Sequence, residues 1–252
     1  MSDSLTKQIT LYVEEHIDSF HTQRFEKLQK LNLKEVLKRK NPYLFKAKNI
    51  LTAQDLVQGI VDAYLQSQEE TLFGTFIEGV AIFVCQQVYG GKKSTTLEGI
   101  DLEFEKDGAI WIVEVKSGPN WANSSQIKKM RQNFVSAKRQ LRQHNPNTPI
   151  IAVNGCCYGK DNKPYKKQHD YFKYCGQEFW QLISGRATLF TDIIEPLAYH
   201  AKEKNEQFLK MYAKVINTFT LAFAQEFCQD GEIDWEKLVV FNSAKRNSST
   251  NK

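Results

Sequence analysis

Residues 99–118 read GIDLEFEKDGAIWIVEVKSG, and three charged residues in this stretch have the types and spacing needed for metal-assisted chemistry. Asp101 is followed by Glu114 and, two residues later, by Lys116. Hard cations such as Mg²⁺ prefer carboxylate oxygens together with waters and substrate phosphates. A lysine beside them can activate a metal-bound water or stabilise charge on a phosphate. The ordinary alternative is a surface hairpin with a chance salt bridge.

An alternation of apolar and polar residues predicts that this stretch is a two-stranded hairpin. Asp107-Gly108 is a preferred two-residue hairpin loop, so the numbers of paired residues should sum to 215. Asp101 then lies opposite Glu114, and Lys116 shares their face of the hairpin. Opposed carboxylates repel each other, and a divalent cation would relieve that repulsion. The other face is apolar and should meet a core: Leu102, Phe104, Val113 and Val115.

Length and composition indicate a globular protein. The chain has 252 residues, of which 41% are hydrophobic and 25% charged, enough for one large domain or a core with helical additions. Mean hydropathy is -0.49. No uninterrupted apolar run reaches membrane-spanning length, and the first residues do not resemble a signal peptide. The five cysteines form no CxxC pair, which favours reduced thiols over a zinc site or disulfides. We therefore expect a cytoplasmic protein without a membrane partner.

The net charge of +5 is mild, but the basic residues are unevenly distributed. No acidic residue occurs between Glu114 and Asp161. The same stretch contains eight basic residues: Lys116, Lys128, Lys129, Arg131, Lys138, Arg139, Arg142 and Lys160. A one-sign stretch after an acidic cluster suggests that a polyanion binds on that side. The alternative is a solvated helix face.

Apolar periodicity predicts helices around the hairpin. Pro42 should interrupt the N-terminal helical region, and Thr52 and Asp55 form a capping box that begins another helix. The strongly apolar segment 71–91 carries one acid, Glu78, and should end at Gly90-Gly91. Further helices are expected at 4–30, 124–143, 171–185 and 192–228, and a buried strand at 149–155.

Asp101 followed by Glu114-Val115-Lys116 resembles the motif of the PD-(D/E)XK nuclease superfamily. Ile100 stands where that motif often has proline. The resemblance implies an α/β fold, with a restriction-endonuclease-like mixed sheet flanked by helices and with N- and C-terminal helical additions. The hairpin would supply the second and third strands of this sheet. Residues 60–90 would form the first core helix, 124–143 the second, and 149–155 the fourth strand.

The resemblance also implies roles for individual residues. Asp101 and Glu114 match the metal-binding acids, and the backbone carbonyl of Val115 matches a further ligand of Mg²⁺. Lys116 matches the catalytic lysine. Glu78 matches an acid that some members carry on the first core helix, where it supports a metal-bound water. A helix-surface glutamate is the alternative interpretation of Glu78.

Longer strings resemble type II restriction endonucleases, in particular a PmeII-like group related to enzymes that cut GGNCC-containing sites. These strings are EVKSGPNWANSSQIKKM, NPYLFKAKN and CGQEFWQLISG, within a resemblance that covers roughly residues 33–241. The resemblance implies Mg²⁺-dependent cleavage of both strands of a short palindromic DNA site. A palindromic site implies a two-fold homodimer.

The expected organisation has four parts. Residues 1–70 form an N-terminal helical region for dimerisation or for embracing DNA, and residues 71–190 form the nuclease core. Residues 191–241 form C-terminal helices, and 242–252 a disordered tail.

The segment that follows Lys116 supplies the candidate DNA contacts, because Asn and Gln can read adenine whereas Lys and Arg can read guanine. The candidates are Asn120, Asn123, Ser124, Gln126, Lys128 and Arg131. Helix capping and solvation are equally reasonable roles for them. Trp121 is expected to pack, and the loop 160–167 to contact phosphates.

Two other functions fit the same residues. One is a repair or recombination nuclease of the same fold, which would recognise DNA structure rather than sequence. The other is a non-catalytic DNA-binding protein in which the acids are structural. The complete set of Asp101, Glu114 and Lys116 argues against the second alternative, because three strained charges have no evident use without catalysis.

Overall fold

A computed structural model describes residues 2–164 and 170–245 of the chain. Backbone contacts divide it into two compact units. The sheet unit comprises Met1–Phe20 and Phe73–Tyr199, and the helical unit comprises His21–Leu72 and His200–Lys252. Two long helices, α1 (Ser2–Gln29) and α4 (Ala53–Tyr89), each contribute residues to both units.

The sheet unit is built on a four-stranded mixed sheet with the strand order β1-β2-β3-β4. Its strands are β1 (Leu102–Lys106), β2 (Ala109–Lys116), β3 (Ile150–Cys156) and β4 (Phe172–Cys175). The first pair is antiparallel, and β3 runs parallel to both β2 and β4. This arrangement, flanked by helices, confirms the predicted restriction-endonuclease-like α/β fold class. Only an isolated bridge between Lys92 and Glu103 pairs with the outer edge of β1 among the described residues.

The predicted hairpin register is confirmed throughout the ladder, from Leu102↔Val113 to Lys106↔Ala109. Asp107 and Gly108 have φ values of 52° and 72°, the left-handed conformation that a tight two-residue loop of this kind requires. The ladder begins at Leu102, so Asp101 lies one residue outside it. The predicted direct opposition of Asp101 and Glu114 is therefore not a ladder pair.

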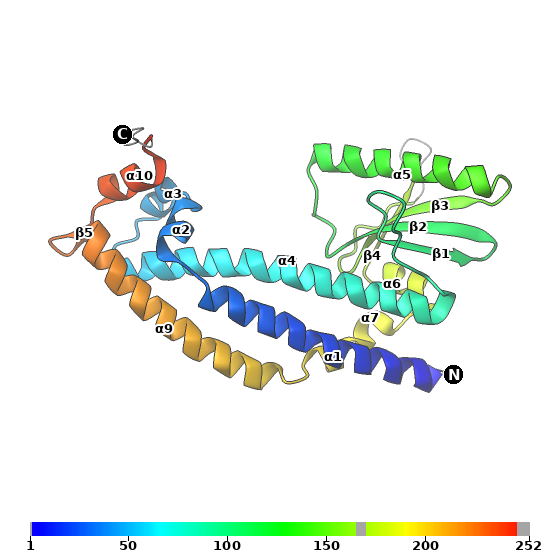
Figure 1. Cartoon of the computed structure of the whole chain (residues 1–252), viewed down its shortest axis with the longest axis horizontal. Coiled ribbons are helices and arrows are strands. Elements are labelled where there is room, and N and C mark those ends of the chain that lie inside the picture. Colours follow the sequence, from blue (N-terminus) through cyan, green and yellow to red (C-terminus); the bar gives the residue numbers. More distant parts are fainter. Residues whose placement is uncertain (1, 165–169, 246–252) are drawn as a thin grey trace, which may run out of the picture. The chain divides into compact units, whose positions relative to one another are not determined.

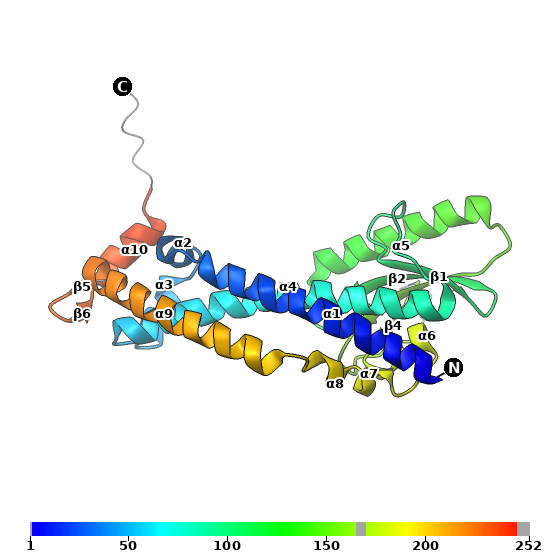
Figure 2. The same cartoon turned by 60° about the horizontal axis from the view of Figure 1, so that its bottom comes forward.

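Helices cover both faces of the sheet (Figure 1). On one face, α5 (Ser124–His144) buries Met130, Phe134 and Ala137 against Ile112 and its neighbours. The other face packs against the sheet-unit parts of α1 and α4 and against α6 (Gln177–Ser184), as Figure 2 also shows. The apolar residues expected at that core, Leu102, Phe104, Val113 and Val115, are all buried there.

The expected helix over 171–185 is wrong in its first half. Residues Phe172–Cys175 form β4, and the helix α6 begins only at Gln177. Gly176, with φ of 55°, separates the two elements. The short apolar segment is compatible with either state, and its parallel pairing with β3 decides for the strand.

The two helices expected near 56–64 and 71–91 are one continuous helix, α4, because no helix-breaking residue separates them. Its length and composition alone would also let it cross a membrane. Buried side chains along it, such as Val57, Val61, Val80 and Val84, belong to the cores of the two units. These contacts favour a core helix.

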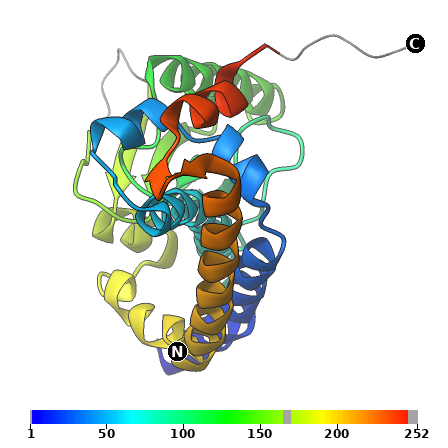
Figure 3. The ribbon, with the colours of Figure 1, turned by 90° about the vertical axis from the view of Figure 1, so that its left-hand side faces the viewer.

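The helical unit has its own apolar core, with Leu28, Leu56, Phe223 and Phe227 fully buried. The expected break in the helical region lies at residues 39–41, directly before Pro42, but Pro42 itself begins a short helix that Asn41 caps. Figure 3 shows how α9 leads through a two-stranded hairpin into α10. The remaining elements are α2 (Leu33–Lys38), α3 (Pro42–Ala47), α9 (Ala201–Phe227), β5 (Cys228–Gln229), β6 (Glu232–Ile233) and α10 (Trp235–Ser243).

Two further one-turn helices, α7 (Leu189–Asp192) and α8 (Ile194–Leu197), complete the sheet unit. The expected roles of residues 1–70, 71–190 and 191–241 stay predictions. Most of the tail expected at 242–252 lies outside the described residues, which end at 245.

Candidate active site

Asp101 is held at the open end of the hairpin by two hydrogen bonds to β2. Its N–H donates to the carbonyl of Val113 at 2.9 Å, and its Oδ2 accepts from the N–H of Val115 at 2.8 Å. The side chain thus takes a backbone position that strand pairing would otherwise fill. This bond fixes the carboxylate beside the last residues of β2.

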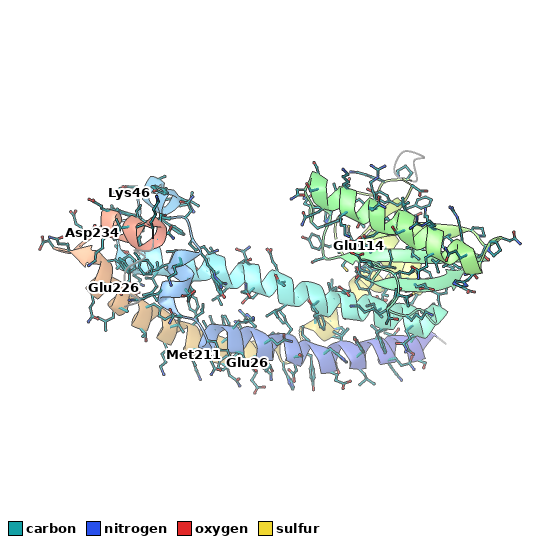
Figure 4. The ribbon with its side chains drawn as sticks, turned by 45° about the horizontal axis from the view of Figure 1, so that its top comes forward. Glu26, Lys46, Glu114, Met211, Glu226 and Asp234 are labelled. Carbon is teal, nitrogen blue, oxygen red and sulfur yellow. The ribbon has the colours of Figure 1, made fainter. Side chains whose placement is uncertain are left out.

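Glu114 and Lys116 lie on one face of β2 and form an ion pair, with 2.8 Å between Nζ and Oε1. Glu114, labelled in Figure 4, lies on β2 and is only 8% exposed. Its second carboxylate oxygen, Oε2, is buried without a hydrogen-bond partner. Lys116 lies over the ring of Trp121, 4.8 Å from the ring centroid, and Trp121 packs on the core beneath α5 as expected.

Glu78, on α4, reaches the same cluster and is bound by a lysine that the sequence did not single out. Lys93, in the segment between α4 and β1, pairs with Glu78 at 2.9 Å. This ion pair raises the pKa of Lys93, and the charge of Asp101 raises it further. Nothing in the sequence pattern indicated Lys93, because only the tertiary fold brings its segment back to α4.

The electrostatic centre of the cluster is Asp101. Burial raises the pKa of its carboxyl from 3.8 to about 6, and the negative charge of Glu78 contributes in the same direction. The hydrogen bond from Val115 and the charge of Lys116 oppose this shift. An acid of this kind is ionised at neutral pH but holds its negative charge at a cost, which a bound cation would reduce.

The unpaired Oε2 of Glu114 is the observation that tests whether a divalent cation fits here. A buried carboxylate oxygen without a partner is costly, and a hard cation is the partner that such oxygens prefer. Asp101 supplies a second carboxylate at the same end of the sheet. Within residues 2–164 and 170–245, no group of three or more acidic, histidine or cysteine side chains is arranged as a ready metal site. A divalent cation would therefore be bound by Asp101 and Glu114, because Glu78 is ion-paired with Lys93.

The peptide carbonyl of Val115 faces the Asp101 side of β2. The Val113 carbonyl and the Val115 N–H both bond to Asp101. In contrast, the carbonyl of Lys116 accepts from Cys157 on the β3 side. Because a residue's N–H and C=O point to the same side of a strand, the Val115 carbonyl is available to the acidic end of the site.

Comparison with known proteins adds the decisive observation. A family model described as type II restriction endonuclease EcoO109I matches residues 7–205, which contain the whole acidic cluster. The chain belongs to this family. No curated protein matches the chain significantly. For an EcoO109I-family restriction endonuclease, DNA is the substrate, and the cluster of Asp101, Glu114 and Lys116 is the candidate active site.

In this restriction endonuclease, two of the six candidate DNA contacts cap α5. The Asn123 side chain accepts from the N–H groups of Ser125 and Gln126, and the Gln126 side chain accepts from the N–H of Asn123. Capping was one of the roles considered for these residues, and the structure shows it for Asn123, the N-cap of α5, and for Gln126. Both side chains are exposed and keep their amide NH₂ groups for a further partner.

Substitution of Asn123 separates capping from DNA reading. Asn123→Ala should lower the free energy of unfolding by about 1 kcal/mol. Asn123→Ser should leave the free energy of unfolding nearly unchanged, because serine caps a helix nearly as well as asparagine. If Asn123 also contacts a base, the serine variant should lose DNA affinity at full stability. Thermal unfolding and DNA binding of the two variants check this. A serine variant with unchanged DNA binding would leave capping as the sole role of Asn123.

The other candidates, Asn120, Ser124, Lys128 and Arg131, are all exposed around the N-terminal part of α5. The whole of the acid-free stretch is not, however, a cationic surface. Lys138 is buried and binds the backbone carbonyl and carboxylate of Asp170. The charge pattern could not show this, because residue 170 lies beyond the acid-free stretch.

Behind the site, a buried lysine connects two loops. Lys173, on β4, donates to the carbonyl of Pro119 at 2.9 Å and to the carboxylate of Asp161 at 2.6 Å. Pro119 belongs to the segment after Lys116, and Asp161 to the predicted phosphate-binding loop 160–167. Residues 165–167 of that loop lie outside the described residues. The misassigned helix over 171–185 concealed Lys173, because the residue was not expected on the sheet.

Proposed function

We propose that this protein is an Mg²⁺-dependent type II restriction endonuclease that hydrolyses phosphodiesters in both strands of a short palindromic DNA site. One observation carries the proposal: Glu114, which pairs with Lys116 through Oε1, has a second, buried carboxylate oxygen without a hydrogen-bond partner, in a chain of the EcoO109I family. A polar atom in that position lacks the partner that a divalent cation would provide.

Each residue of the cluster has a proposed role in binding the metal ion or in hydrolysis. Asp101, Glu114 and the Val115 carbonyl would hold Mg²⁺, and Glu78 would accept a hydrogen bond from a metal-bound water once Lys93 moves aside. Bound Mg²⁺ would act as a Lewis acid and stabilise negative charge on the phosphate oxygens. The ammonium group of Lys116, positioned by Glu114 and Trp121, would orient the attacking water. The water would attack phosphorus in line with the 3′ oxygen, whose bond to phosphorus breaks. The attacking water would lose a proton to the solvent and the leaving oxygen would take one from the solvent, which gives a 5′-phosphate and a 3′-hydroxyl.

The finer assignments follow from the sequence resemblance. We propose a PmeII-like enzyme with a GGNCC-containing site, acting as a cytoplasmic homodimer. Residues 1–70 and the helices within 191–241 would form the dimer interface or embrace DNA. Asn120, Asn123, Ser124, Gln126, Lys128 and Arg131 would contact the double-stranded DNA, with the amides reading bases and the cations binding phosphates or guanine.

Incubation of the purified protein with phage or plasmid DNA, with and without Mg²⁺, tests this function. Discrete fragments that form only with Mg²⁺ are the expected result, and sequencing of the fragment ends would give the site. A smear, or cutting confined to branched or damaged DNA, would favour the repair nuclease. A retarded band without cleavage would favour a non-catalytic DNA-binding protein.

A further inference from the structure

Lys93 is a second lysine at the acidic cluster. The cluster thus contains two ion pairs besides Asp101: Lys116 with Glu114, and Lys93 with Glu78. The charge of Asp101 raises the pKa of Lys93. The charge of Glu78 raises the pKa of Asp101, and the charge of Lys116 lowers it. The five groups therefore form one electrostatic unit, although residues 78 and 93 lie outside the hairpin.

The backbone next to Lys93 is fixed, whereas its side chain is largely exposed and is held by the ion pair with Glu78. Lys92 exchanges two backbone hydrogen bonds of 2.9 Å with Glu103, which attaches this segment to the edge of β1. The side chain of Lys93 is 62% exposed, compared with 26% for Lys116. Solvent weakens an ion pair whose cation is this exposed, so Lys93 can exchange Glu78, which is 25% exposed, for another anionic partner.

The formal charges of the cluster match a phosphodiester only if Lys93 is counted. Glu78, Asp101 and Glu114 together with Lys93 and Lys116 carry one excess negative charge, which a divalent cation would convert to one excess positive charge. A phosphodiester carries one negative charge, so the site with DNA and cation would then be neutral. Without Lys93, the same site would hold an uncompensated negative charge in a partly buried place, which is unfavourable.

We infer that Lys93 leaves Glu78 when DNA binds and contacts a backbone phosphate at the cleavage site, as a second cationic residue beside Lys116. The inference rests on the proposed nuclease function, and it explains how Glu78 becomes available in the DNA complex. A lysine that only neutralised Glu78 would stay on that acid and would contribute nothing to DNA binding.

The salt dependence of DNA binding, measured with Ca²⁺ as the divalent cation, tests this inference, because Ca²⁺ also takes carboxylate and carbonyl oxygens as ligands. The probe is a 30-base-pair duplex of mixed sequence at a fixed Ca²⁺ concentration, titrated at several NaCl concentrations. Each phosphate contact adds about 0.9 to the slope of log K against log salt. Lys93→Met should therefore reduce the slope by about 0.9, and Lys93→Arg should restore it. Lys92→Met is the matched control. Lys92 is the neighbouring lysine, and because it is bridged to Glu103 its side chain shares the face of Glu103, opposite to that of Lys93.

Three outcomes would overturn the inference. An unchanged slope in Lys93→Met, beside normal binding by the unmodified protein, would show that Lys93 only neutralises Glu78, and the nuclease function would stand. Equal losses in Lys92→Met and Lys93→Met would indicate a general charge effect of the segment. No duplex binding by the unmodified protein would contradict both the inference and the proposed function. A normal circular dichroism spectrum for each variant establishes that the comparison is between folded proteins.

Discussion

Lys116→Ala should reduce DNA cleavage by about 10²- to 10⁴-fold, the contribution typical of a positioned group that assists proton transfer, while DNA binding is retained. The physical reason is that Lys116 is bound by Oε1 of Glu114 and lies over the ring of Trp121. An ammonium group held at both sides is oriented before substrate arrives. Single-turnover cleavage of plasmid DNA with Mg²⁺ measures the rate, and duplex binding in EDTA measures affinity.

A second substitution distinguishes two roles of Lys116. Arginine keeps the positive charge but cannot be deprotonated in proteins. Lys116→Arg should therefore stay inactive if lysine exchanges a proton with the attacking water, and should recover activity if only its charge is needed. Lys30→Ala is the control for loss of an ion-paired lysine, because Lys30 pairs with Glu26 on the exposed surface of α1. Near-normal cleavage by Lys116→Ala would remove this residue from the mechanism.

Asp101→Asn should make the metal-free protein more stable at pH 8, although the same change should abolish cleavage. The carboxyl has a pKa of about 6 in the folded protein and 3.8 as its ordinary value. The folded state therefore binds this proton more tightly than the unfolded state. The stability that Asp101 contributes is fully present below about pH 4 and is lost as the pH rises through about 6. Removal of the ionisable group should recover roughly 2–3 kcal/mol at pH 8, or about 4–10 °C in Tm.

Thermal unfolding in EDTA between pH 4 and pH 8 checks this prediction, and the advantage of the variant should vanish near pH 4. Asparagine retains an oxygen that accepts from the Val115 N–H, whereas alanine would leave that group unpaired. Asp107→Asn, in the exposed hairpin turn, is the matched control for the loss of an aspartate carboxylate. Mg²⁺ should raise the Tm of the unmodified protein and leave Asp101→Asn unchanged. A large loss of stability in EDTA at pH 8 would make Asp101 a structural residue.

The sequence alone predicted the hairpin and its partners, because the signals there are local. Asp107-Gly108 specifies the turn, and a specified turn sets the register of every following pair. The alternation of apolar residues then decides which face meets the core. These two rules were sufficient to put Glu114 and Lys116 on one face and to make Asp101 their neighbour.

Only the tertiary structure decided the features that depend on segments far apart in the chain. The register rule extended the ladder to Asp101. In the structure, the side chain of Asp101, rather than a backbone carbonyl, accepts the hydrogen bond from the N–H of Val115. Pairing with β3 made 172–175 a strand and put Lys173 behind the site. The charge pattern likewise could not distinguish the buried Lys138 from its exposed neighbours.

The two ion pairs of the cluster differ in whether the sequence could predict them. The pair of Glu114 and Lys116 was predictable, because residues two apart on a strand lie on the same face. The pair of Glu78 and Lys93 spans fifteen residues and a helix end, and its members meet only because the segment after α4 turns back along the edge of β1. Local periodicity contains no information about such a return, so the second half of this charge cluster became visible only in the folded chain.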